Sequence, residues 1–110
     1  MKFLYTIYDQ AAQTWLTPFT SDTDSAAQRE FLTIISDVTV MRNSPSDFDL
    51  YVIGTFSQIT GTISSKETVQ KIVNGLSLVQ AHNARLQNEN AQVSDDSSIL
   101  PSAEGTNTTQ

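Results

Sequence analysis

The chain has 110 residues, enough for one small domain, and its 38% apolar residues allow that domain a modest core. Six basic and twelve acidic residues give a net charge of −6, and because the cations are not clustered, direct binding to nucleic acid phosphates is disfavoured. The sequence contains no cysteine, which excludes a disulfide framework, a thiol nucleophile and a thiolate metal site. All aromatic residues lie before residue 57, so we expect an N-terminal globular core.

The first predicted element is a strand over residues 2–8, which is rich in aromatic and β-branched residues. Alternate residues would place Phe3, Tyr5 and Ile7 on one face of a sheet and the intervening side chains on the other. Because both faces carry apolar residues, the strand is expected to be central. The apolar run is too short for a signal peptide, and no membrane association is expected. A second short strand is predicted over residues 15–19, with Pro18 confining it to a sheet edge or a strand end.

A helix is predicted next, beginning at Ser25, which forms a capping-box pattern with Gln28. It is expected to end near Val40 and to pack on the sheet through apolar residues at helical spacing: Ala27, Phe31, Ile34, Ile35 and Val38. Residues 41–49 contain Pro45 within a group of short polar residues, which predicts a loop.

A hairpin is predicted from a strand over residues 50–56 and a returning strand over residues 62–64. Gly54 inside the first strand indicates a bulge or a close backbone approach, and Gly61 suits a turn position with positive φ. The predicted fold class is therefore α+β. Residues 1–65 are expected to form a small, mostly antiparallel sheet of three to four strands packed by one helix.

Residues 66–90 are predicted to form a long amphipathic helix, because apolar residues recur at spacings of three and four. This stripe is the predicted partner interface, and its members are Val69, Ile72, Leu76, Val79, Asn83 and Leu86. It is suited to docking on the chain's own sheet, to pairing with a second copy, or to binding another protein. Residues 91–110 are mainly polar and are predicted to form a disordered tail.

Candidate catalytic residues are few. His82 is the single histidine, and a solvated position on the late helix is favoured over a catalytic role. The pairs Asp22 with Asp24 and Asp47 with Asp49 have the oxygen ligands that Mg²⁺ prefers, but both lie where helix caps and turns favour aspartate. We therefore predict a protein that is not an enzyme and that has no catalytic residues, no metal site and no cofactor.

Aromatic residues of the sheet give an alternative function, since they can form a stacking platform for single-stranded DNA. The candidate stacking residues are Phe3, Tyr5, Tyr51 and Phe56. Ordinary core packing is the competing interpretation, because basic residues are not interleaved with these aromatics.

A series of short motifs runs in order through residues 3 to about 65. The motifs are Tyr5-Thr6-Ile7-Tyr8-Asp9, Pro18-Phe19, Asp24 to Ala27 with Arg29 and Phe31, Pro45 to Tyr51, Ile53-Gly54, Thr60-Gly61 and Ile63. The series resembles the small non-structural protein of gokushovirus-type microviruses, which are single-stranded DNA phages. That family usually has an acidic residue after the strand corresponding to residues 50–56, where this chain has Ser57 and Gln58.

The resemblance implies a phage protein made in the host bacterial cytoplasm and absent from the mature capsid. It also implies a role in genome replication, in the switch to single-stranded DNA synthesis and packaging, and it carries over no catalytic residues. We expect a replication-associated adaptor that contacts a phage or host replication protein, with self-association through the helix of residues 66–90 as a further option. A single-stranded DNA-binding module is the alternative.

Overall fold

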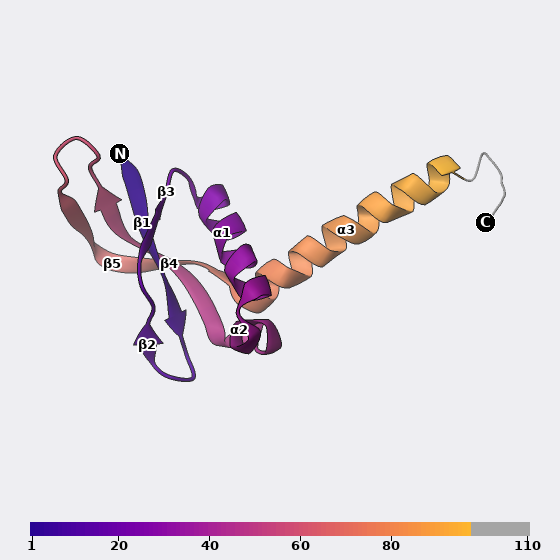
Figure 1. The fold of residues 1–110 in the computed structure, drawn as a ribbon, viewed down its shortest axis with the longest axis horizontal. Coiled ribbons are helices and arrows are strands. Elements are labelled where there is room, and N and C mark those ends of the chain that lie inside the picture. Colours follow the sequence, from indigo (N-terminus) through magenta and orange to yellow (C-terminus); the bar gives the residue numbers. More distant parts are fainter. Residues whose placement is uncertain (98–110) are drawn as a thin grey trace. The chain divides into compact units, whose positions relative to one another are not determined.

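The computed structural model describes residues 1–97, with side chains described as far as Glu89. Residues 98–110, which belong to the predicted tail, lie outside the described residues. The chain forms two compact units, Met1–Val79 and a second that begins at Gln80. The sheet and its covering helices belong to the first unit (Figure 1).

Five antiparallel strands form one sheet in the order β2-β1-β4-β5, and β3 pairs with β1 beside this path. The strands are β1 (Lys2–Asp9), β2 (Thr14–Trp15), β3 (Phe19–Ser21), β4 (Phe48–Phe56) and β5 (Ile63–Asn74). Between β3 and β4 lie α1 (Asp24–Asp37), α2 (Thr39–Asn43) and the 3-10 helix η1 (Pro45–Asp47), and α3 (Gly75–Ser97) follows β5. The predicted mixture of helices and strands and the antiparallel sheet are confirmed, but the sheet has five strands where three to four were expected.

Helix α1 packs on one face of the sheet, beside β1 and β4 (Figure 1). It buries Ala27, Phe31 and Ile35 as its apolar spacing predicts. The buried core residues of the unit are Tyr5, Ile7, Ala27, Phe31, Ile35, Met41, Phe48, Leu50, Val52 and Leu78. Leu78 is the fourth residue of α3, so the start of that helix belongs to the same core.

The start and end of α1 differ from the prediction. Thr23, not Ser25, caps the helix, because the Thr23 hydroxyl accepts a hydrogen bond of 3.1 Å from the backbone N–H of Ala26. The helix ends at Asp37, since Val38 adopts an extended backbone with φ −100° and ψ 114°. Helix α2 then begins at Thr39, so the single helix predicted to reach Val40 is divided into two.

The hairpin of β4 and β5 has the glycine positions that the sequence predicts. Gly61 has a φ of 75° in the turn, where the N–H of Ser57 donates to the carbonyl of Thr62 at 2.9 Å. The register shifts next to Gly54, which confirms a bulge there. A Cβ atom at this position would collide with the carbonyl oxygen of Ser64, so β4 and β5 approach more closely than a larger residue permits.

The prediction of a helix over residues 66–90 is wrong for residues 66–74, which belong to β5. Spacings of three and four do not distinguish a helix from a strand over a short segment. The β-branched residue Val73 favours a strand and pairs with Leu50 of β4. Helix α3 begins at Gly75, where the Asn74 side chain accepts a 3.0 Å hydrogen bond from the N–H of Leu76. It continues to Ser97, so residues 91–97 are helical where a disordered tail was predicted.

Candidate functional site

Three aromatic side chains form a cluster on the sheet, which we call the aromatic surface (Tyr8, Trp15 and Tyr51). The Trp15 ring lies 4.6 Å from the Tyr8 ring and 4.9 Å from the Tyr51 ring, measured between centroids. The two tyrosine rings are 6.5 Å apart in an edge-on arrangement. Trp15 is 46% exposed although it contacts both tyrosines, so the cluster presents a large aromatic side chain to solvent.

Strand alternation places this surface on the sheet face opposite α1. Tyr5 and Ile7 lie in the core, so Tyr8 points to the other face. Tyr51 pairs with Thr6 across β1 and β4, and Trp15 pairs with Tyr8 across β1 and β2. Sequence reasoning missed this set, although the predicted two-sided strand already placed Tyr8 on the second face.

A buried carboxylate lies beside the aromatic surface. Asp49 pairs with Tyr8 in the strand register and is 3% exposed. Its oxygens accept hydrogen bonds from the side-chain amides of Gln10 at 2.6 Å and Asn74 at 2.8 Å, and the Lys71 ammonium lies 3.3 Å away. These donors satisfy the buried charge and connect β4 to the start of α3.

The aspartates of the two candidate pairs make different contacts in the structure. Asp49 is held by the three donors named above, while Asp47 lies in η1. Asp22 forms an ion pair of 3.0 Å with Lys2. Within the described part of the chain, no three histidine, aspartate or glutamate side chains lie close enough together to hold a metal ion. His82 lies on α3.

The predicted stacking residues do not form one platform. Tyr5 is fully buried and donates a 2.6 Å hydrogen bond to Asp24, so its ring is not available to a base. Phe3 is 41% exposed on the α1 side of the sheet, while Tyr51 belongs to the aromatic surface on the opposite side. Phe56 is half-buried near the turn end of β4.

The predicted partner stripe is divided between two elements. Val69 and Ile72 lie on β5, whereas Leu76, Val79, Asn83 and Leu86 lie on α3, so no continuous helical stripe of six exists. Ile72 and Val79 pack against the core. Val69, Leu76 and Leu86 are exposed by 41%, 38% and 43%. The exposed part of the stripe on α3 consists of Leu76, Asn83 and Leu86.

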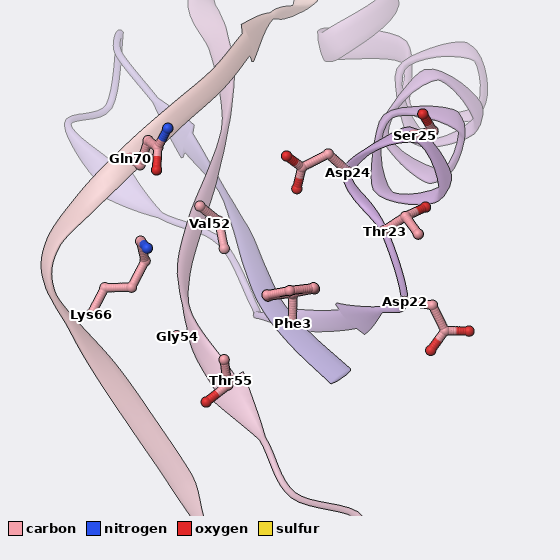
Figure 2. Close-up of a pocket in the computed structure, with 10 residues that line it drawn as sticks. All are labelled: Phe3, Asp22, Thr23, Asp24, Ser25, Val52, Gly54, Thr55, Lys66 and Gln70. Carbon is pink, nitrogen blue, oxygen red and sulfur yellow. The ribbon is translucent and has the colours of Figure 1, made fainter. Parts of the chain in front are cut away.

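A cavity of about 420 Å³ lies on the α1 side of the sheet, at the start of that helix (Figure 2). The residues that line it are Phe3, Asp22, Thr23, Asp24, Ser25, Val52, Gly54, Thr55, Lys66 and Gln70. Burial raises the pKa of the Tyr5 hydroxyl, and its hydrogen bond to Asp24, one of the lining residues, raises it further. The protonated Tyr5 hydroxyl donates a 2.6 Å hydrogen bond to Asp24, and the raised pKa extends this donation to higher pH.

Comparison with protein-family models gives a match over most of the chain. The model described as Phage ORF5 protein matches residues 2–78, which covers the sheet, α1, α2 and the first residues of α3. No curated protein and no solved structure matches the chain. No helix in the described residues has the length and apolar character needed to cross a membrane.

Proposed function

Because the chain belongs to the Phage ORF5 protein family, we propose that it is a non-structural phage protein that works by binding another protein during genome replication. The resemblance to the gokushovirus protein supports the replication role and a location in the host bacterial cytoplasm. The partner we propose is a phage or host replication protein, and the chain acts as an adaptor without catalysis of its own.

The observation that carries the protein-binding role is the aromatic surface. Tryptophan and tyrosine are enriched among the residues that contribute most to the free energy of protein binding. Trp15 presents an exposed ring, and the packed rings of Tyr8 and Tyr51 hold it in position at little cost in side-chain entropy. The acidic net charge also favours a protein partner over a phosphate backbone.

Self-association remains a second proposal, now limited to the part of the stripe on α3. Leu76, Asn83 and Leu86 keep heptad spacing on this helix, which suits pairing with a second copy. Light scattering coupled to size-exclusion chromatography should then give the mass of a dimer, and Leu86→Asp should return the mass to that of a monomer. A monomeric parent chain at tens of micromolar concentration would remove this proposal.

The adaptor role is tested with Trp15→Ala and the purified replication initiator protein of the phage. We expect Trp15→Ala to weaken binding by about thirtyfold, since truncation of such a residue costs about 2 kcal/mol or more. Ile59→Ala is the matched control, because Ile59 is an apolar side chain that is 95% exposed in the hairpin turn. The same binding constant for the parent and Trp15→Ala would refute the role of the aromatic surface.

Fluorescence anisotropy with a labelled single-stranded oligonucleotide distinguishes the adaptor role from the alternative function, single-stranded DNA binding. Bases stack on aromatic side chains, so a DNA-binding module would also depend on Trp15, and its affinity would fall as salt is raised. Binding of the oligonucleotide together with no binding of the initiator would replace the adaptor proposal with the DNA-binding one.

A further inference from the structure

The cavity at the start of α1 combines an apolar floor with charged walls. Phe3 of β1 and Val52 of β4 lie between the two walls in Figure 2. Asp24 projects from the start of α1 on one side, and Lys66 and Gln70 of β5 lie on the other. Its volume of about 420 Å³ falls within the range of small-ligand pockets, and it exceeds the size of one long side chain.

The two walls carry opposite charges that the structure leaves without ionic partners. Among residues 1–89, the ion pairs are Lys2 with Asp22 at 3.0 Å and Lys71 with Asp49 at 3.3 Å. Neither pair includes Asp24 or Lys66. The Asp22 carboxylate is neutralised by Lys2, so Asp24 is the anion that faces the cavity without a compensating cation.

Asp24 is held in place before any ligand arrives. The hydroxyl of the buried Tyr5 donates to one of its oxygens at 2.6 Å, which leaves the second oxygen free to accept. Asp24 is also the first residue of α1, where the helix dipole stabilises a negative charge. An ionised carboxylate in a fixed orientation binds a cation with less loss of side-chain entropy than a mobile one.

We propose that this cavity binds an arginine side chain of a partner protein. The guanidinium group donates to the free oxygen of Asp24, and the aliphatic stem lies on Phe3 and Val52. The Phe3 ring, 41% exposed, also attracts the planar cation, which favours arginine over lysine. Lys66 on the opposite wall meets a carboxylate of the same partner segment. A phosphate ligand fits less well, because it would lie near the carboxylates of Asp22 and Asp24.

This site is separate from the aromatic surface and adds to the proposed function a second contact with stated partner chemistry. It shares with that function the premise that the chain binds another protein. The two are tested with different variants, so either can fail alone. If the cavity does not bind the probe described below, the proposed role of Trp15 in partner binding still stands. If Trp15→Ala does not weaken partner binding, the proposed arginine site still stands.

The test uses the full chain and Nα-acetyl-L-arginine, which carries a guanidinium group and a free carboxylate. Its control is Nα-acetyl-L-citrulline, which has nearly the same shape without the positive charge. Titration followed by amide chemical shifts in NMR should move the signals of Phe3, Asp24 and Lys66 with the arginine probe. We expect at least about tenfold weaker binding of the citrulline probe, since a charge-assisted hydrogen bond is lost.

Asp24→Asn removes the charge while its amide oxygen still accepts from Tyr5, and it should weaken binding of the arginine probe by about tenfold or more. Asp37→Asn makes the same chemical change at the other end of α1 and should leave binding unchanged. Tyr5→Phe should weaken binding by a smaller factor, because Asp24 keeps its charge and loses its orientation. Equal binding of both probes, or an equal effect of Asp24→Asn and Asp37→Asn, would overturn the proposal.

Discussion

Replacement of Asp49 by alanine should destabilise the compact unit more than any exposed charge substitution. The Asp49 carboxylate is 3% exposed and accepts from Gln10 at 2.6 Å and from Asn74 at 2.8 Å. Each hydrogen bond to a charged group contributes about 1.5–3 kcal/mol, whereas the half-exposed Lys71 adds at most about 1 kcal/mol. Both amide donors can partly return to water, so we expect a loss of about 3 kcal/mol in the free energy of unfolding.

Urea unfolding followed by the fluorescence of Trp15 measures this loss, because Trp15 is the single tryptophan and its ring contacts Tyr51 on β4, the strand that carries Asp49. For a unit of this size, about 3 kcal/mol corresponds to a fall of roughly 12–24 °C in Tm. Asp37→Ala is the control, since Asp37 is exposed in the last turn of α1 and its loss should change stability by less than about 0.5 kcal/mol.

A change of less than about 0.5 kcal/mol for Asp49→Ala, with an unchanged slope against urea, would refute the reasoning. It would mean that water replaces the carboxylate as partner of Gln10 and Asn74 at no net cost. Asp49→Asn adds a second check, because it keeps the shape and turns an amide group toward existing donors. We expect Asp49→Asn to lower the free energy of unfolding by about half as much as Asp49→Ala does, or more.

Three further predictions concern single positions. Because burial and Asp24 raise the pKa of the Tyr5 hydroxyl above its ordinary 10.0, the unfolded chain loses this proton at lower pH than the folded chain. The contribution of this shift to the free energy of unfolding is present below the ordinary pKa and is lost as the pH rises toward the folded-state pKa. Above the ordinary pKa, the free energy of unfolding should therefore fall less steeply with pH for Tyr5→Phe than for the parent, as measured by urea unfolding at a series of pH values. Thr23→Ala should cost about 1 kcal/mol in thermal unfolding and Ser25→Ala much less, and equal effects would contradict the assignment of the cap. Gly54→Ala should destabilise by about 1–3 kcal/mol through its clash with the Ser64 carbonyl, and unchanged stability would show that β5 shifts freely.

The N-terminal part of the fold follows closely from its residue pattern. Alternation predicts β1, and helical spacing predicts the face of α1 that packs on it. Turn chemistry predicts the positive φ of Gly61, because few other residues adopt it. The capping residue of α1 is harder to predict from the sequence, since Thr23 and Ser25 are both good capping residues. The path of the chain from β3 selects Thr23.

Residues 66–74 could not be assigned from pattern alone. Their apolar spacing fits a helix, and the competing strand becomes favourable only when β4 offers a row of unpaired backbone groups. Pairing with a distant strand is not visible in local spacing. The aromatic surface was missed for a related reason, because Trp15 meets Tyr51 only through the pairing of β2 and β4 with β1.

The junction between β5 and α3 has no linking residue, since the strand ends at Asn74 and the helix begins at Gly75. Asn74 holds Asp49 on one side and the first turn of α3 on the other, and a Cβ on Gly75 would collide with the Pro45 carbonyl. Insertions or deletions there would break contacts on both sides. The turn at Gln58, Ile59 and Thr60 is exposed, and the side-chain hydrogen bonds of Thr60 go only to Ser57 and Thr62 of the same turn. We therefore expect this turn to tolerate changes of length and to carry a tag or an inserted peptide.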